Sequence, residues 1–188
     1  MTITGILLAA GRGKRFDPAG RHNKLLQTLG NGEPVVAASA RHLLAVLPQV
    51  LAVVRPGDEQ VAAVLRSLGC TVHVCPDADS GMAASLRYAI GLAQNASGWL
   101  IALGDMPYVQ PGTMRALVQA IGQGAGIAAP VFQGRRGNPV AFSARHLQGL
   151  LALEGDQGAR TILKNHAVNE VILSDHGILR DIDTPADL

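Results

Sequence analysis

A glycine-rich, cationic segment follows the first apolar run of the chain and has the composition of an anion-binding loop. The apolar residues 3–9 are followed by two glycines and three cations within five residues, and Lys24 lies nine residues further on: Gly11, Arg12, Gly13, Lys14, Arg15 and Lys24. Glycine lets backbone N–H groups approach an anion closely, and Arg and Lys neutralise its charge. A solvated basic loop is the alternative, but the apolar run and the glycines that frame the charges favour a site for a phosphate compound.

The segment departs from the two common phosphate-binding motifs. A P-loop requires GxxxxGK[ST], but Gly13-Lys14 is followed by Arg15, and no glycine precedes them at the required spacing. A dinucleotide fingerprint, GxGxxG, requires glycine where Phe16 stands, and no helical pattern begins there. Because the loop continues as far as Asn23, we expect it to fold over a triphosphate.

An isolated aspartate follows a second apolar run. Residues 100–103 are aliphatic and lead directly into Gly104-Asp105-Met106-Pro107. A carboxylate at the end of a strand can hold Mg²⁺, which takes one or two protein carboxylates and completes its shell with phosphate oxygens and water. Asp105 could instead cap the turn before Pro107. A phosphate loop on a neighbouring strand favours the metal role.

The C-terminal residues offer candidates for a second carboxylate. Asp181 and Asp183 would point to the same side of an extended segment. Asp183-Thr184-Pro185 also has the pattern of a helix N-cap followed by proline at the first helical position. The pattern leaves open both the choice between capping and metal binding and the choice between Asp181 and Asp183.

Short aliphatic runs alternate with longer amphipathic stretches, which predicts a parallel α/β sheet. In the first two thirds of the chain we expect strands at 3–9, 50–54, 71–74 and 99–103, and helices at 34–47, 58–68, 82–94 and 112–121. This order implies right-handed crossovers with helices on both faces of the sheet. Aromatic residues make up only 3% of a chain that is 48% hydrophobic, so the core must be aliphatic, as in most parallel sheets.

The pattern loosens after residue 122 but gives no sign of a second domain. We expect further strands at 126–131, 140–142 and 168–173, and helices at 144–151 and 159–165. The expected fold is a single Rossmann-like domain over residues 1–188, with three α/β/α layers and a mostly parallel sheet. Ligands of such sheets bind at the carboxyl ends of the strands, so the loops after residues 9, 74 and 103 should meet there.

Composition excludes several classes of protein. The formal net charge of +2 is too small for a nucleic-acid-binding domain, and the cations form local clusters that suit a small anion. Cys70 and Cys75 lack CxxC spacing, and we expect both to be buried free thiols. The N-terminal apolar run has no basic residues before it and is far shorter than the ~20 residues that span a bilayer. We therefore expect a cytoplasmic protein with no nucleic-acid or membrane partner.

These motifs, in this order, resemble the molybdenum cofactor nucleotidyltransferases. The resemblance extends over nearly the whole chain, in residues 8–16, 24–26, 81–86, 104–107, 135–140, 155–160 and 181–185. Within that family Ala-Ala-Gly in the first motif is typical of the cytidylyltransferase branch, whereas the guanylyltransferase branch usually has Gly-Gly. Ala10 therefore indicates CTP. The combination of 135–140 with 155–160 also resembles the cytidylyl branch. The implied fold is that of the nucleotide-diphospho-sugar transferases.

The resemblance implies transfer of CMP from CTP to the phosphate of molybdopterin, with Mg²⁺ as cofactor and pyrophosphate as product. It assigns catalysis to Lys24, Arg15 and Asp105, and the metal to Asp105 and Asp183. It assigns nucleotide binding to Leu8, Ala9, Ala10, Gly11, Arg12, Gly13, Lys14, Gly81 and Ser85. It assigns the acceptor to Arg135, Arg136, Asn138 and Arg160, although each arginine could equally be a surface residue. Asn138 stands where many relatives have His, and both side chains can donate a hydrogen bond.

Three other functions remain compatible with the same motifs. The protein could use GTP, or it could act on a sugar-1-phosphate, although such enzymes are usually longer after the Gly-Asp-Met-Pro turn. It could also be a non-catalytic carrier that delivers the cofactor to a client molybdoenzyme. The presence of Lys24, Asp105 and Asp183 argues against a carrier, because a carrier does not need them.

Overall fold

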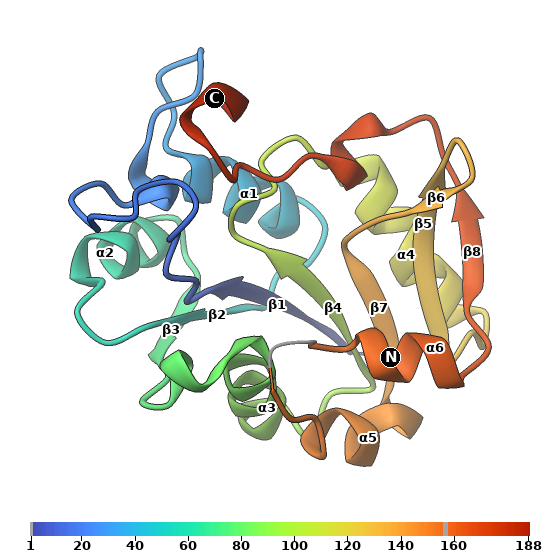
Figure 1. Cartoon of the computed structure of the whole chain (residues 1–188). Helices are drawn as coiled ribbons and strands as arrows, with labels where there is room; N and C mark the ends of the chain where they lie inside the picture. Colours follow the sequence, from blue (N-terminus) through green and yellow to red (C-terminus); the bar gives the residue numbers. More distant parts are fainter. Residues whose placement is uncertain (1, 156–157) are drawn as a thin grey trace.

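The computed structural model describes residues 2–155 and 158–188, in which the strands form one mixed eight-stranded sheet (Figure 1). The strands are β1 (Ile3–Ala9), β2 (Val50–Val54), β3 (Thr71–Val74), β4 (Gly98–Leu103), β5 (Ile127–Phe132), β6 (Arg135–Arg136), β7 (Val140–Ser143) and β8 (Asn169–Ile172). Their order is β3-β2-β1-β4-β7-β5-β6, with β8 beside β5. β1 to β4 are parallel to their neighbours in this group, whereas β7 runs antiparallel to β4 and β5. The sheet is mostly parallel, as predicted.

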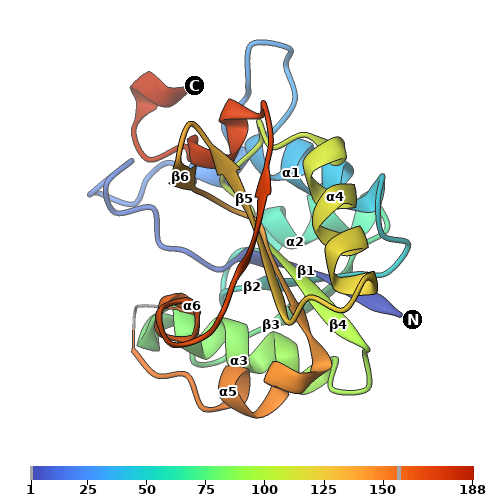
Figure 2. The ribbon, with the colours of Figure 1, turned by 90° about the vertical axis from the view of Figure 1, so that its right-hand side faces the viewer.

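Helices cover both faces of the sheet, which confirms the three-layer α/β/α prediction (Figure 2). One face carries α1 (Val35–Leu44), α2 (Glu59–Ser67) and α4 (Pro111–Gly122), and the other carries α3 (Met82–Leu92), α5 (Leu147–Leu151) and α6 (Arg160–Asn165). Among the helices of residues 2–155 and 158–188, none combines the length and apolar composition that crossing a bilayer requires.

The alternation of side chains along the strands divides the core into two layers. Leu7 packs in the core beneath α1, α2 and α4, and its neighbour Ile6 packs in the core beneath α3, α5 and α6. Trp99 is fully buried in the second core, where its indole N–H donates to the Ala93 carbonyl at 3.0 Å. Each fully buried aliphatic side chain contributes about 1.5–3 kcal/mol, so both layers stabilise the sheet that positions the loops.

Element boundaries follow the predictions most closely where the apolar pattern ends at a turn. The first three strands have the predicted bounds. The helix predicted at 34–47 ends at Leu44, although Leu47 beyond it is buried. A buried leucine in the turn after a helix extends the apolar pattern without extending the helix. The helix predicted at 82–94 ends at Leu92. The next N–H, that of Ala93, donates to the Ile90 carbonyl, three residues back, as in the tightened last turn of a helix.

The turn after β4 lies directly against the end of β1. The Gly104 N–H donates to the Leu8 carbonyl at 2.8 Å, and a Cβ on Gly104 would lie only 3.2 Å from that oxygen. A side chain at this position would force one of the two backbones to shift by a few tenths of an ångström, so glycine favours the close approach. Asp105, the next residue, is thereby placed beside the cationic loop.

Candidate functional site

A cavity of about 410 Å³ opens at the carboxyl ends of β1 and β4, within the ~300–1,000 Å³ usual for small-molecule sites. It is lined by Leu8, Ala9, Ala10, Gly11, Arg12, Lys14, Lys24, Leu25, Ala78, Asp79, Gly81, Met82, Ser85, Leu103 and Asp105. Most of the residues expected to bind the nucleotide therefore share one cavity with Lys24 and Asp105. Gly13, Arg15 and Asp183 lie outside its lining.

The loop after β1 places Lys24 in the lining of this cavity. Gly13 has φ +60°, and a Cβ there would lie 3.4 Å from Lys24 Cγ, so the backbone runs close along the lysine stem. Lys24 begins a 3-10 helix, Lys24–Leu26, which is capped by the Asn23 side chain accepting from the Leu25 N–H at 3.0 Å. Lys24 is only 8% exposed. Its ammonium therefore needs charged or hydrogen-bonding partners nearby.

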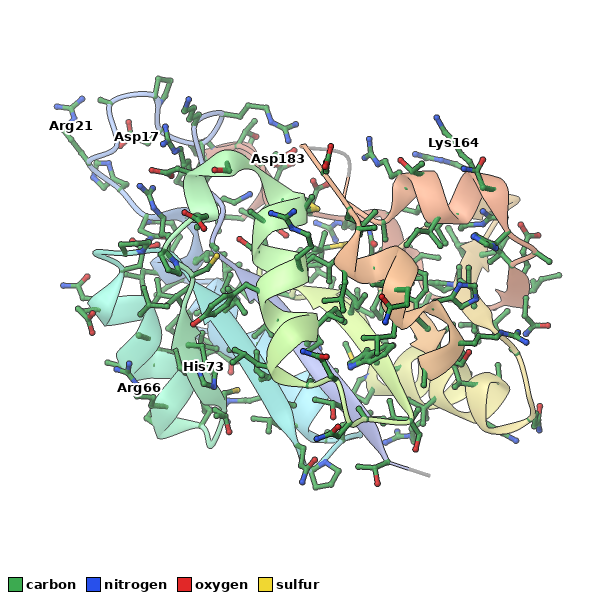
Figure 3. The ribbon with its side chains drawn as sticks, turned by 90° about the horizontal axis from the view of Figure 1, so that it is seen from below. Asp17, Arg21, Arg66, His73, Lys164 and Asp183 are labelled. Carbon is green, nitrogen blue, oxygen red and sulfur yellow. The ribbon has the colours of Figure 1, made fainter. Side chains whose placement is uncertain are left out.

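Those partners are two aspartates from distant parts of the chain. Lys24 Nζ lies 2.6 Å from Asp105 Oδ2 and 3.4 Å from Asp183 Oδ1. Arg15 Nη1 lies 2.5 Å from Asp183 Oδ2. Figure 1 shows the dark-red C-terminal segment returning to the blue N-terminal part of the chain. Figure 3 labels Asp183, which belongs to that C-terminal segment, near the N-terminal loop. Four residues assigned to catalysis or metal binding are thus joined by ion pairs.

The capping role considered for Asp183 belongs to the next residue, Thr184. Thr184 caps the last 3-10 helix, Pro185–Asp187, in a reciprocal arrangement with the Asp187 side chain, whose Oδ2 accepts from the Thr184 N–H at 2.7 Å. The Asp183 carboxylate is consequently free to pair with Lys24 and Arg15. The pattern Asp183-Thr184-Pro185 predicted an N-cap followed by proline, and the structure places that cap at Thr184.

Asp105 and Asp183 form a hard, anionic oxygen pair. Nearby Asp181 has its pKa raised, first by loss of hydration and then by the negative charges of Asp183 and Asp105. Within residues 2–155 and 158–188, no group of three or more His, Cys, Asp and Glu side chains could hold a metal ion. Two carboxylates nevertheless fit Mg²⁺, because this ion takes its remaining ligands from substrate phosphates and water.

An ion pair at the rim of the cavity was not anticipated from the sequence. Arg12 Nε lies 2.6 Å from Asp79 Oδ1, and Arg55 Nη2 lies 3.7 Å from the same oxygen. The hydrogen bond from Arg12 lowers the pKa of Asp79, and the Asp79 carboxylate raises the pKa of Arg12. The segment containing Asp79 follows a predicted strand, which is the only local signal for it. Nothing local distinguishes Arg55, which directly follows β2.

The first turn of α3 forms another side of the cavity. Gly81, with φ +114°, reverses the chain before the helix, and Ser85 is buried one turn later. Met82 lies between them and was not expected in the site. A helix N-terminus carries partial positive charge, which suits a wall that faces an anionic ligand.

The residues assigned to the acceptor lie outside the cavity lining. Arg135 and Arg136 are exposed on β6, where Arg136 Nη2 lies 2.6 Å from Glu170 Oε1 of β8. The Asn138 N–H donates to the Ile178 carbonyl at 3.0 Å, and Arg160 is exposed at the start of α6. In the motif 155–160, Asp156 and Gln157 lie outside the described residues. The structure thus brings together the nucleotide and metal candidates, but not the acceptor candidates.

The cationic loop extends away from the sheet beyond the site. Asp17 organises it by accepting from the Ala19 N–H at 2.9 Å and the His22 N–H at 2.8 Å. Figure 3 shows the side chain of Arg21 directed outward at its far end. Arg15, by contrast, turns back toward Asp183.

A mostly parallel α/β sheet with a glycine-rich cationic loop and a lysine-bridged carboxylate pair at its carboxyl edge defines a nucleotide-binding α/β protein. The chain belongs to the MobA-like NTP transferase domain family, whose sequence profile matches residues 5–171. It is therefore a member of a nucleotidyltransferase family, as the motifs indicated.

Several relatives match almost the whole chain. The purine catabolism protein PucB of Bacillus subtilis is 30% identical over 97% of this chain and 92% of its own length. A molybdenum cofactor guanylyltransferase of Cupriavidus necator is 31% identical with the same coverage. The crystal structure of Rv0371c from Mycobacterium tuberculosis has a TM-score of 0.84 at 30% identity, covering 100% of this chain and 95% of that one. Rv0371c has also been solved in complex with manganese, with a TM-score of 0.80 at 28% identity and coverages of 100% and 96%.

Proposed function

We propose that this protein transfers CMP from CTP to the phosphate of molybdopterin and releases pyrophosphate. The observation that carries the proposal is the single cavity in which the Ala9–Lys14 loop, the first turn of α3, Lys24 and Asp105 meet. Membership of the NTP transferase family supports the nucleotide, and the molybdenum cofactor guanylyltransferases among the relatives support the acceptor.

Ala10 supports the choice of CTP over GTP. It is 8% exposed and belongs to the residues that line the cavity. A methyl group at this position takes space that glycine would leave open, and a pyrimidine base needs less space than a purine. The relatives named guanylyltransferases make GTP the second candidate, to be decided by the same experiment.

The proposed mechanism is charge neutralisation and alignment of two anions. A phosphate oxygen of the acceptor attacks the α-phosphorus in line, and the bond to pyrophosphate breaks. The nucleophile is already an anion, so no strong general base is required. Lys24 and Arg15 neutralise the charge that develops at the α-phosphate, and Arg12 and Lys14 hold the other phosphates. Asp105 and Asp183 would hold Mg²⁺, which shields phosphate charge when it is bound.

We assign the acceptor to the second half of the chain, with Arg135, Arg136, Asn138 and Arg160 as its contacts. The exposure of Arg135 and Arg160 supports this assignment, since both can reach an incoming anion. We further propose that residues 1–188 work as one domain, which the pairing of β7 with β4 supports. The two free cysteines are consistent with a cytoplasmic protein, which would pass the product to a client molybdoenzyme.

The test is pyrophosphate release with metal-loaded molybdopterin, Mg²⁺ and either CTP or GTP. Turnover with CTP is expected, and Ala10→Gly should shift the ratio of kcat/KM values toward GTP. Turnover of the native protein with GTP alone would reverse the nucleotide assignment. Turnover only with a sugar-1-phosphate would replace the acceptor. Full function of Asp105→Ala in cells would favour a carrier.

A further inference from the structure

We propose that Asp175 is a positioning residue that fixes the distance between Asp105 and Asp183. The inference rests on the proposed function, in which those two carboxylates hold the divalent cation. Asp175 is 7% exposed and precedes the 3-10 helix His176–Leu179. It is absent from the cavity lining, so any effect on the site has to pass through other residues.

Both oxygens of the Asp175 carboxylate are engaged. Oδ2 accepts from the Gln110 N–H at 2.9 Å and from the Thr113 hydroxyl at 2.6 Å, and Oδ1 accepts from the Gly177 N–H at 2.9 Å. Gln110 is the N-cap of α4 and Thr113 lies in its first turn. A buried carboxylate is well placed there, because the unpaired N–H groups and the positive end of the helix dipole stabilise it. The residue therefore joins the C-terminal segment firmly to the start of α4.

This junction connects the two segments that carry the metal-binding candidates. Asp105 is the second residue of the loop between β4 and α4, and this loop ends at Gln110, which is bonded to Asp175. The C-terminal segment runs from Asp175 to Asp183, and the Ile182 N–H donates to the Asp105 carbonyl at 2.8 Å. Two hydrogen bonds thus join the segments, one between Gln110 and Asp175 and one between Ile182 and Asp105. The carboxylates of Asp105 and Asp183 lie at the end of the second bond. Releasing the Asp175 end would let Asp183 move relative to Asp105.

Contacts between the two ties leave little freedom for the segments to slide. Gly177 packs directly on the Tyr108 carbonyl and has no room for a side chain. The Arg180 guanidinium stacks 4.1 Å from the centre of the Tyr108 ring, a cation–π contact. Ile178 accepts from the Asn138 N–H at 3.0 Å, which extends the junction toward the proposed acceptor side. These contacts transmit the position of Asp175 on α4 along the segment to Ile182, which is bonded to Asp105 and directly precedes Asp183.

The experiment measures metal affinity apart from turnover. In Asp175→Asn the amide nitrogen cannot accept a hydrogen bond, so at least one donor loses its partner. Mn²⁺ alone is titrated into the protein by calorimetry, and CTP binding is measured separately in the presence of a chelator. We expect Mn²⁺ affinity to fall at least about tenfold, as for other residues that orient metal ligands, while metal-free CTP affinity stays unchanged.

Matched variants separate positioning from general destabilisation. Leu117→Ala removes a fully buried side chain from the same helix, α4, and should lower the melting temperature without weakening Mn²⁺ binding. Thr113→Val, which loses one bond to Asp175, should give a smaller loss of Mn²⁺ affinity, and Thr113→Ser should restore it. If Asp175→Asn does not fold, the comparison of Thr113→Val with Thr113→Ser tests the inference instead.

Two results would overturn the inference in different ways. Unchanged Mn²⁺ affinity in Asp175→Asn and Thr113→Val, beside a loss in Asp183→Asn, would reject the positioning role and leave the proposed metal site intact. Unchanged affinity in Asp183→Asn as well would reject the metal site on which the inference rests. Equal weakening in Leu117→Ala would show that loss of stability alone is responsible.

Discussion

At the level of single residues, Lys24 is the side chain that links the two candidate metal-binding carboxylates. Its ammonium is largely buried and lies within 2.6 Å of Asp105 and 3.4 Å of Asp183. Arg15 also pairs with Asp183, so two cations face the two carboxylates, and a divalent ion bound there would replace these ion pairs. A buried charge that loses its partner is strongly unfavourable, so these three residues depend on one another.

Replacing Lys24 with methionine should abolish most activity. The change keeps much of the stem volume but leaves two carboxylates facing each other and removes a positive charge from the α-phosphate. We expect kcat to fall roughly 10²–10³-fold, the usual cost of losing one charge-stabilising donor. Pyrophosphate release measures this, with Lys164→Met on α6 as the control. A kcat equal to that of the native enzyme would contradict the role of Lys24.

Neutralising Asp79 should strengthen nucleotide binding. Asp79 pairs with Arg12 at 2.6 Å, and a triphosphate would compete with this carboxylate for the guanidinium. Asp79→Asn removes the competing charge, so CTP should bind a few-fold more tightly, and most clearly at low salt because exposed charges are screened. Titration calorimetry at two ionic strengths measures the change. Weaker binding would mean that Asp79 itself contacts the nucleotide, and Glu154→Gln is a matched control outside the cavity lining.

At the scale of elements, close backbone approaches position the segments that carry the site. Gly104 brings the turn after β4 against β1, and Gly177 brings the C-terminal segment against Tyr108. The turn after β4 contains no helix or strand, and the C-terminal segment contains only short 3-10 helices, so local periodicity predicts neither approach. The cap of the last 3-10 helix is local by contrast, since Thr184 directly precedes Pro185 and bonds to Asp187 three residues on.

Alanine substitutions at two glycines should have opposite effects on stability. In Gly177→Ala the new methyl group would collide with the Tyr108 carbonyl, and overpacking of this kind costs about 1–3 kcal/mol. Gly91 lies in α3 with nothing within 4 Å of its Cβ position, so Gly91→Ala should stabilise by about 0.5–1 kcal/mol. Urea denaturation measures both. Equal stability of Gly177→Ala and the native protein would contradict the close packing.

At the scale of the whole molecule, the sheet separates two aliphatic cores. Cys70 is buried in the core beneath α1, α2 and α4, and Cys75 is buried in the core beneath α3, α5 and α6. The prediction of buried free thiols is therefore confirmed. Burial raises the pKa of the Cys70 thiol from 9.0 to about 11, because the core cannot hydrate a thiolate.

The raised pKa gives stability a pH dependence in the alkaline range. The unfolded chain releases the Cys70 proton near 9.0 and the folded protein only near 11, so the folded state binds more protons between these values. The contribution of Cys70 to the free energy of unfolding should therefore be fully present below pH 9 and be lost as the pH rises toward 11. Cys70→Ala should show a shallower decline in melting temperature over this range. An identical pH slope in both proteins would contradict the assignment.

Much of the fold could be predicted from the sequence because its signals are local. Strand and helix periodicity, the turn after residue 103 and the glycine–cation loop all lie within short stretches of chain. Parallel strands then bring their carboxyl ends to one edge, so the meeting of Ala10, Gly81 and Asp105 around one cavity follows from topology. The antiparallel insertion of β7 between β4 and β5 could not be predicted this way, since strand order depends on long-range pairing.

The α/β class, the glycine–cation loop and the candidate carboxylates can all be read from short stretches of sequence. Which of these groups touch depends on the packing of the folded chain. Arg12 and Asp79 are 67 residues apart, and Lys24 and Asp183 are 159 apart. Contacts across such separations depend on how whole segments pack, as the seat of Asp175 on α4 illustrates. Local sequence patterns show which functional side chains are present. The packing of distant segments determines which of these side chains come into contact.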